Sequence, residues 1–447
     1  MHQMAPSPAA FKSAGPLSGR VRVPGDKSIS HRSLMLSALA VGTSSVEGLL
    51  EGEDVLATAA AMRAMGARIE RGADGRWTIH GVGVGGLLQP QQALDMGNSG
   101  TSTRLLMGLV ASHAITATFI GDASLSKRPM NRVIDPLSLM GAEFTASPGG
   151  RLPLVLRGIA PAVPIEYRLP VASAQVKSAL LLAGLNTPGI TRVVEPVPTR
   201  DHSERMLRGF GAELTVDQDG TGARVISIRG EAELRPQHIV VPGDPSSAAF
   251  PVVAALLVPG SDVIVENVGL NPTRAGLFDV LRMMGADIEL VDAREVGGEP
   301  VADLRVRGSS LHGVEVPPDI APSMIDEFPI LFVAASVAKG RTVARGLEEL
   351  RVKESDRLAL MARGLARLGV RVEESKDGLI IDGTDGALLA ANGPVEIAAE
   401  LDHRIAMSFA VAGLVSANTV TIDDMAPVAT SFPTFQRLMQ SLGATVA

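Results

Sequence analysis

Cysteine is missing from this chain of 447 residues, and aromatic residues make up only 3% of it. The absence of cysteine excludes disulfide bonds, thiolate metal sites and cysteine nucleophiles, and it fits a reducing compartment. Scarce aromatic side chains argue against stacking on nucleobases or sugars. The eight histidines are scattered without the spacing of metal ligands, so we expect no metal site.

Cationic runs and long apolar runs are also missing. The formal net charge is -7, so we expect neither nucleic acid nor a membrane surface as a partner. Apolar stretches stay shorter than the roughly 18 residues that a membrane span needs, and the N-terminus lacks the apolar segment of a secretion signal. We therefore expect a cytoplasmic protein whose first dozen residues form a frayed tail.

Two glycine-containing motifs resemble nucleotide-binding loops without their required context. Residues 81–86, GVGVGG, match the dinucleotide-binding fingerprint, but a segment with a proline follows instead of a helix. Residues 25–28, GDKS, resemble the end of the Walker A loop of P-loop kinases, but the upstream glycine has the wrong spacing. We therefore predict neither a dinucleotide site nor a nucleoside triphosphate site.

One sequence pattern recurs six times along the chain. Each copy resembles MRAMGARIE at 62–70, which is typical of an amphipathic helix, a glycine and a strand with alternating polarity. The glycines are nearly evenly spaced, at Gly66, Gly141, Gly211, Gly285, Gly369 and Gly443. The pattern predicts that a glycine in the left-handed conformation ends each of these helices.

A second type of helix precedes each copy of the pattern and is apolar on nearly all sides. Such helices are buried in globular proteins. Each is preceded by small polar residues suited to an N-cap, at 25–28, 97–100, 173–175, 243–247, 325–327 and 402–404. Six α/β units therefore follow, arranged either as a solenoid or as two lobes of three units. We favour two lobes that divide near residues 240–245, because wholly apolar helices must be enclosed.

Several cations lie near these helix starts although the chain is acidic. They are Lys27, Arg32, Arg104, Lys177 and Arg404, with further cations at 127–128 and 351–357. Unpaired N–H groups and the helix dipole already favour an anion at such positions, and added cations strengthen that preference. This distribution predicts a site for phosphate or carboxylate groups. We interpret the nearby His31 and His403 as packing or hydrogen-bonding residues.

Eight motifs, in order along the whole chain, together resemble the signature set of the EPSP synthase family. They are PGDKSISHR (24–32), GNSGTSTR (97–104), GDASLSKRPM (121–130), SAQVKSALLLAGL (173–185), PGDPSSAAF (242–250), SMIDEFPIL (323–331), LRVKESDR (350–357) and DHRIAMSF (402–409). Leu105, where the first-described type has proline, and SAQ at 173–175 resemble the class II branch. One departure is the absence of a lysine before the FP of 429–435, so the phosphate contact that this lysine makes in the first-described type is either absent or replaced by Thr430 or Ser431.

The resemblance implies a two-domain, inside-out α/β fold, barrel-like, with six βαβαββ repeats. Residues 1–22 and 244–447 are expected to form the lobe that contains both termini, and residues 23–243 the second lobe. Three repeats belong to each lobe, and the active site is expected in the cleft between them.

The resemblance also implies an activity, which is the transfer of the enolpyruvyl group of phosphoenolpyruvate to the 5-hydroxyl of shikimate 3-phosphate. This reaction belongs to the shikimate pathway, which leads to chorismate and the aromatic amino acids. Neither metal nor organic cofactor is expected, the protein is expected to be a monomer, and glyphosate is an expected inhibitor. The alternatives are a UDP-N-acetylglucosamine enolpyruvyl transferase, which typically uses a cysteine, and a non-catalytic phosphoanion-binding protein.

The family pattern assigns roles to individual residues of this sequence. The catalytic residues are expected to be Asp326 as base and Glu354 as proton donor, with Lys27 as an alternative donor. Residues expected to bind shikimate 3-phosphate are Lys27, Ser28, Arg32, Ser173, Ala174, Gln175, Arg200, Asp326 and Lys353. Residues expected to bind phosphoenolpyruvate are Lys27, Gly100, Arg128, Gln175, Arg357 and Arg404.

Overall fold

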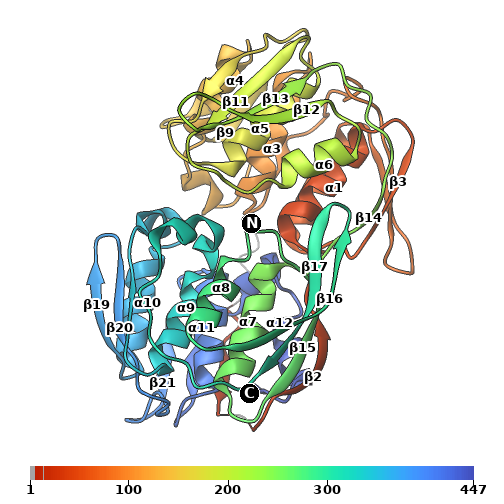
Figure 1. The fold of residues 1–447 in the computed structure, drawn as a ribbon. Coiled ribbons are helices and arrows are strands. Elements are labelled where there is room, and N and C mark those ends of the chain that lie inside the picture. Colours follow the sequence, from red (N-terminus) through yellow and green to blue (C-terminus); the bar gives the residue numbers. More distant parts are fainter. Residues whose placement is uncertain (1–5, 14, 447) are drawn as a thin grey trace. The chain divides into compact units, whose positions relative to one another are not determined.

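A computed structural model describes residues 6–13 and 15–446 of the chain (Figure 1). The chain divides into two compact units. The terminal unit comprises Met1–Pro24 and Pro242–Ala447, and the central unit comprises Gly25–Val241. Each unit encloses a hydrophobic core of its own, so each is described separately below.

The strands of the described residues form six sheets, three in each unit, and all six follow one plan. Four sheets of this plan consist of a parallel outer pair, to which two further strands are added in antiparallel orientation, as in the order β6-β7-β9-β8. The sheet of β18, β20 and β19 has isolated parallel bridges, such as Glu315 with Val343, in place of the outer strand. In the sixth sheet the chain's first strand supplies the antiparallel partner of the outer pair.

The central unit contains three repeats of helix and strand. The first consists of α1 (Lys27–Leu39), β3 (Thr43–Glu47), α2 (Glu53–Ala64), β4 (Arg68–Arg71), β5 (Trp77–His80) and the later β14 (His238–Val240). The second consists of β6 (Leu94–Asp95), α3 (Gly100–Ala111), β7 (Thr116–Ile120), η1 (Leu125–Lys127), α4 (Asn131–Leu139), β8 (Glu143–Ser147) and β9 (Arg151–Arg157). The third consists of β10 (Glu166–Arg168), α5 (Ala174–Leu185), β11 (Ile190–Glu195), α6 (His202–Gly209), β12 (Leu214–Gln218) and β13 (Arg224–Arg229).

The terminal unit repeats the same order with two strands from the start of the chain. Its first repeat consists of β2 (Ser18–Arg22), α7 (Pro245–Leu257), β15 (Asp262–Gly269), α8 (Gly276–Met283), β16 (Asp287–Val296) and β17 (Glu299–Arg307). The second consists of η2 (Pro318–Ser323), η3 (Ile325–Glu327), α9 (Phe328–Val337), β18 (Arg341–Ala344), η4 (Glu348–Val352), α10 (Arg357–Arg367), β19 (Arg371–Ser375) and β20 (Gly378–Asp382). The third consists of β21 (Val395–Ile397), α11 (His403–Gly413), β22 (Val420–Ile422), η5 (Ala426–Thr430), α12 (Phe435–Ser441), β23 (Thr445–Val446) and β1 (Ala9–Lys12).

The apolar helices lie inside each unit and the sheets lie outside them. In the terminal unit α7, α9 and α11 contact one another, and all residues of α7 are buried. In the central unit α3 contacts both α1 and α5. Burying side chains on every face of a helix requires neighbours all round it, which explains why the sheets surround these helices. The expected inside-out α/β architecture is thereby confirmed.

Both ends of the repeated helices have the expected chemistry. The glycines that follow the outer helices adopt positive φ in all six repeats, from 89° at Gly369 to 105° at Gly66. Side chains cap five of the six buried helices at their N-termini, namely Asp26, Ser99, Ser173, Asp244 and Asp402. The sixth helix, α9, continues directly from η3, and its N-cap residue Glu327 makes no side-chain capping bond.

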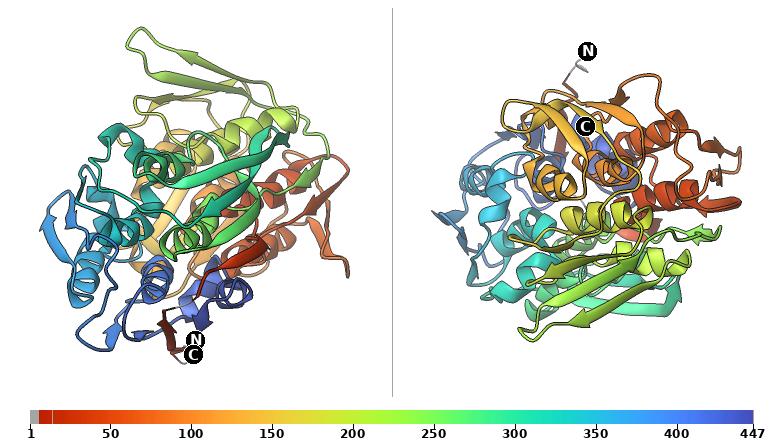
Figure 2. Two further views of the ribbon diagram at one scale, coloured as in Figure 1. Left: turned by 60° about the horizontal axis from the view of Figure 1, so that its bottom comes forward. Right: turned by 90° about the horizontal axis from the view of Figure 1, so that it is seen from above.

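The start of the chain corrects one expectation. Within the first dozen residues, expected to be a frayed tail, β1 pairs with both β22 and β23. Phe11 of β1 is only 1% exposed and belongs to the core of the terminal unit. The sixth repeat would lack its last strand without this segment, so tertiary pairing orders a sequence with little local signal. Figure 2 shows β1 beside the C-terminal strand.

Helices long and apolar enough to cross a bilayer do not occur among the described residues.

Candidate active site

Most of the candidate residues lie at or just before the N-termini of the buried helices and of α10, and Arg128 and Arg200 lie in loops. At the start of α1 the Asp26 carboxylate accepts the Ile29 N–H at 2.8 Å. At the start of α11 the Asp402 carboxylate accepts the Arg404 N–H at 2.9 Å. The remaining N–H groups and the positive end of the helix dipole favour anions at these positions. The candidates fall into two sets, one in each unit.

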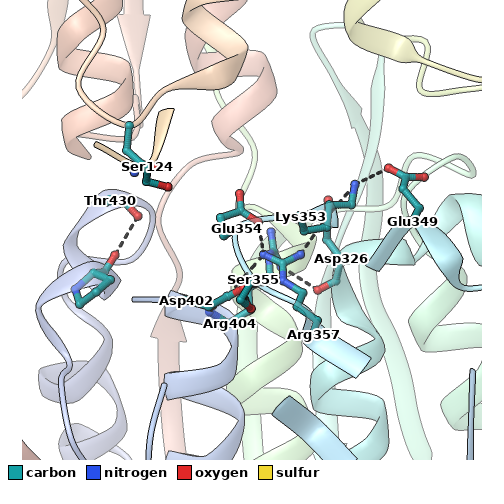
Figure 3. A network of polar contacts seen from close by, with 12 residues as sticks. Ser124, Asp326, Glu349, Lys353, Glu354, Ser355, Arg357, Asp402, Arg404 and Thr430 are labelled. Carbon is teal, nitrogen blue, oxygen red and sulfur yellow. Dashed lines mark hydrogen bonds and ion pairs between the residues drawn. The ribbon is translucent and has the colours of Figure 1, made fainter. Parts of the chain in front are cut away.

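Arg357 organises the set of the terminal unit (Figure 3). Its Nε donates to Asp402 at 2.9 Å, its Nη1 to Asp326 at 3.2 Å and its Nη2 to Glu354 at 2.6 Å. Only 1% of the Arg357 side chain is exposed. Three carboxylates from three separate segments therefore surround one buried guanidinium group, and this group fixes their positions.

The charges of this cluster support one another. Burial alone would lower the pKa of Arg357. The neighbouring charges of Asp402, Glu354 and Asp326 raise that pKa by more than burial lowers it, so the net pKa lies above the usual value. Burial likewise raises the pKa of Asp402, and the charge of Arg357 more than offsets that effect, so the net pKa lies below the usual value. The pair between Arg357 and Asp402 therefore remains ionised at neutral pH.

Asp326, Lys353 and Glu354 remain partly accessible around this buried pair. Their side chains are 17%, 22% and 29% exposed, whereas Asp402 is 0% exposed. The Lys353 Nζ lies 3.9 Å from Asp326 and also pairs with Glu349. Carboxylates that are held in place and still reach solvent are suited to proton transfer, whereas the buried Asp402 is suited to orienting Arg357.

Arg404 and His403 lie side by side in sequence but have different environments. Arg404 is 14% exposed, and its Nη1 donates to the Asp326 carbonyl oxygen at 3.1 Å. Burial lowers the pKa of His403 to about 3, and the charge of Arg404 is the next cause. His403 is therefore a neutral, buried residue at neutral pH, in agreement with its interpretation as a packing residue.

In the central unit, Arg32 is held at the first turns of α1. Its Nε donates to Ser203 at 2.7 Å and its Nη2 to Ser178 at 2.8 Å. Its Nη1 donates to the carbonyl oxygen of Ser28 at 2.9 Å. Lys27 starts α1 and forms an ion pair with Asp54. The start of α1 therefore carries two cations, Lys27 and Arg32, and the hydroxyl group of Ser28.

A second group in the central unit joins the starts of α3 and α5. Ser173 caps α5 by accepting the Val176 N–H at 3.3 Å, and Ala174 is the first residue of that helix. The side chain of Gln175 accepts from Arg104 Nη1 at 2.9 Å and donates to Thr101 Oγ1 at 3.0 Å. Both helix starts are thus joined through one amide side chain.

Gly100 and Arg128 lie beside this group. A Cβ atom placed on Gly100 would lie 2.8 Å from Arg104 Nη1 and 3.5 Å from Arg128 Nη1. Arg128 Nη2 donates to Asn98 at 2.8 Å and to Ser124 at 3.1 Å. The absence of a side chain at Gly100 therefore leaves room between two guanidinium groups.

Arg200 lies in the loop between β11 and α6 and is partly buried. The carboxylate of Glu195 accepts the N–H of the preceding Thr199 at 2.9 Å, which ties the loop to the end of β11. Thr430 lies in η5 of the terminal unit, where its hydroxyl donates to the Pro427 carbonyl oxygen at 2.8 Å.

Lys177, another cation at a helix start, is paired with carboxylates inside the central unit. It is 0% exposed, and its Nζ lies 3.0 Å from Glu195 and 2.8 Å from Glu204. The helix-start pattern alone does not distinguish this internal ion network from an anion site. The sequence also did not predict two contacts of the site residues. Arg104 contacts Gln175, and Asp402 contacts Arg357.

Two units of three inside-out α/β repeats, with cations at their helix starts, define the class of fold. An enolpyruvyl transferase, NikO from Streptomyces tendae, shares this fold with a TM-score of 0.76 over 99% of both chains, at 19% identity. The EPSP synthase from Acinetobacter baumannii matches at a TM-score of 0.89 and 48% identity, also over 99% of both chains.

Sequence comparison narrows the class further. The profile of the EPSP synthase (3-phosphoshikimate 1-carboxyvinyltransferase) family matches residues 11–439. The 3-phosphoshikimate 1-carboxyvinyltransferase of Novosphingobium aromaticivorans is 74% identical over 97% of this chain and 99% of its own length. This chain belongs to the EPSP synthase family, and the resemblance, fold and transferase class expected from its sequence are confirmed.

Proposed function

We propose that this chain transfers the enolpyruvyl group of phosphoenolpyruvate to the 5-hydroxyl of shikimate 3-phosphate, with release of phosphate. Membership of the EPSP synthase family supports the reaction and its place in the shikimate pathway. The observation that carries the proposal is the Arg357 cluster, in which one buried guanidinium group holds two partly accessible carboxylates, Asp326 and Glu354. A site that only bound anions would gain nothing from these carboxylates.

The two carboxylates match the proton transfers of the reaction. As the 5-oxygen adds to C2 of phosphoenolpyruvate, Asp326 takes the hydroxyl proton and Glu354 delivers a proton to C3. The tetrahedral intermediate then expels phosphate, and loss of a C3 proton restores the double bond. Lys27 is an alternative donor to C3. Each transfer requires a group within hydrogen-bonding reach of the reacting atom.

The substrates dictate the cations around them. Each substrate carries a phosphate of about −1.5 to −2 charge and a carboxylate, so the pair requires several cationic groups. We assign phosphoenolpyruvate to Lys27, Gly100, Arg128, Gln175, Arg357 and Arg404. We assign shikimate 3-phosphate to Lys27, Ser28, Arg32, Ser173, Ala174, Gln175, Arg200, Asp326 and Lys353. The proposal therefore requires residues of both units to act on the same substrate pair.

A phosphate-release assay tests this proposal. We expect turnover when phosphoenolpyruvate and shikimate 3-phosphate are both present, and none when either is omitted. UDP-N-acetylglucosamine in place of shikimate 3-phosphate should give no phosphate. Turnover of phosphoenolpyruvate with UDP-N-acetylglucosamine, but not with shikimate 3-phosphate, would establish the alternative transferase. Binding of the substrates without turnover of either acceptor would establish a phosphoanion-binding protein.

We also propose that the enzyme acts in the cytoplasm as a monomer and that glyphosate inhibits it. The lack of cysteine fits a reducing compartment. The space left beside Arg104 and Arg128 by Gly100 supports the binding of an anionic inhibitor. Sedimentation analysis tests the monomer, and inhibition by glyphosate at varied phosphoenolpyruvate concentration tests whether the two compete.

A further inference from the structure

Glu327 is a buried carboxylate next to the proposed catalytic base, with different partners. Asp326 and Glu327 are neighbours in η3, and the Asp326 carboxylate contacts Arg357. Glu327 is only 2% exposed, and its Oε1 accepts a hydrogen bond from the Ser246 hydroxyl and lies 3.4 Å from Arg404 Nη1. The reaction as proposed above gives Glu327 no role.

A line of buried polar groups supports Glu327. Arg274 Nη2 donates to the Ser246 hydroxyl at 2.6 Å, and the same nitrogen lies 3.2 Å from the Asp244 carboxylate. Because the Ser246 oxygen accepts from Arg274, its own proton is directed to Glu327. Asp244, Ser246 and Arg274 are each at most 5% exposed. Such a network in a low-dielectric interior holds its members in one arrangement.

This network ends at one nitrogen of Arg404. Arg404 Nη1 donates to the Asp326 carbonyl oxygen at 3.1 Å and to Glu327 at 3.4 Å. Within residues 6–13 and 15–446, the side-chain contacts of Arg404 are made through this nitrogen. The edge formed by Nε and Nη2 is therefore left for a carboxylate or phosphate, which such an edge binds through two parallel hydrogen bonds.

We propose that Glu327 is a positioning residue that, together with Ser246, fixes the Arg404 guanidinium so that its Nε–Nη2 edge binds phosphoenolpyruvate. The inference rests on the proposed role of Arg404. Glu327 acts through Arg404 and does not exchange protons with the substrate. Its contribution therefore affects the binding of one substrate and not of the other, whereas a general loss of folding would affect both.

Steady-state kinetics of Glu327→Gln test the proposal. The amide keeps the volume of the side chain and removes its charge. We expect the KM for phosphoenolpyruvate to rise about tenfold, which corresponds to about 1.4 kcal/mol, because a neutral amide holds the Arg404 guanidinium less strongly than a carboxylate does. The KM for shikimate 3-phosphate should change less than about twofold, within the effect of an ordinary surface substitution. Glu373→Gln makes the same chemical change at a side chain that is 50% exposed, and should leave both constants unchanged.

A double-mutant cycle with Arg404→Lys separates this inference from the proposed function. If Arg404→Lys leaves the KM for phosphoenolpyruvate unchanged, the role of Arg404 itself is wrong. If Arg404→Lys raises that KM and the effects of the two substitutions simply multiply, Glu327 does not act through Arg404 and the inference fails. We expect the double variant to be little worse than Arg404→Lys alone.

Substitutions of Ser246 keep the inference testable if Glu327→Gln does not fold. Ser246→Thr retains the hydroxyl that directs Glu327, whereas Ser246→Ala removes it. We expect Ser246→Ala to raise the KM for phosphoenolpyruvate and Ser246→Thr to retain most of the native affinity. Equal KM values in Ser246→Ala and the native protein would refute the proposed network.

Discussion

Replacing His403 by a residue that does not titrate should change how the free energy of unfolding depends on pH. Burial holds the folded-state pKa of His403 at about 3, whereas an unfolded histidine has a pKa of 6.5. Between these values the unfolded state binds more protons, so the free energy of unfolding falls as the pH falls below 6.5. The slope from this one residue is about 1.4 kcal/mol for each pH unit, which amounts to about 2 kcal/mol between pH 6.5 and pH 5.

Urea denaturation followed by circular dichroism at several pH values measures this effect. His403→Gln retains a polar side chain that does not titrate in this range. We therefore expect the free energy of unfolding of the variant to fall less steeply than that of the native protein between pH 6.5 and pH 5, by about 2 kcal/mol in total. Other buried histidines contribute equally to both proteins and cancel in the difference.

His238→Gln provides the control, because the His238 side chain is 58% exposed. Surface substitutions usually change the free energy of unfolding by less than about 0.5 kcal/mol, so the effect of this variant should stay small. Parallel curves for His403→Gln and the native protein over this pH range would refute the reasoning, since they would mean that His403 can be protonated in the folded state at little cost.

Three further substitutions test the two sets of site residues. Lys27→Met should lose most activity in the phosphate-release assay while the circular dichroism spectrum stays native, and full activity would remove Lys27 from the mechanism. Gly100→Ala places a Cβ atom 2.8 Å from Arg104 Nη1, so the inhibition constant for glyphosate should rise; equal constants in both proteins would contradict a steric effect. Asp402→Asn breaks a buried ion pair with Arg357. It should lower the free energy of unfolding by about 3 kcal/mol, as measured by urea denaturation, and raise the KM for phosphoenolpyruvate. Unchanged stability would show that the remaining carboxylates are enough to balance the charge of Arg357.

Local chemistry made the repeated helices and turns predictable from the sequence. A glycine at the end of an amphipathic helix has little steric cost in the left-handed conformation. Gly66 and Gly369 therefore predict the turns that follow their helices without any tertiary contact. The same holds for Asp26 and Asp402, whose short carboxylates reach N–H groups only two or three residues ahead. Residues carrying the family motifs were identified equally early, because each motif is a short contiguous segment.

Pairings between distant segments were decided by the tertiary structure alone. The sequence around Phe11 shows no strand signal strong enough to predict β1, and its order comes from β22 and β23, more than 400 residues away along the chain. Whether a cation at a helix start faces solvent or a buried carboxylate also depends on the neighbouring segments. Lys177 lies between Glu195 and Glu204 for this reason, whereas Arg404 contacts the Asp326 carbonyl oxygen and Glu327 through Nη1.

The sequence by itself therefore determined the repeat, its capped helices and the residue types of the site, because those follow from contacts between residues close in the chain. Only the tertiary structure decided which carboxylates surround Arg357 and why Glu327, next to Asp326, serves Arg404. Adjacent side chains point in different directions from a turn of helix, so Asp326 meets Arg357 of its own repeat, whereas Glu327 meets Ser246 and Arg404 of the two other repeats. The burial that excludes water from those pairs, and so sets the pKa of His403, likewise exists only in the assembled unit.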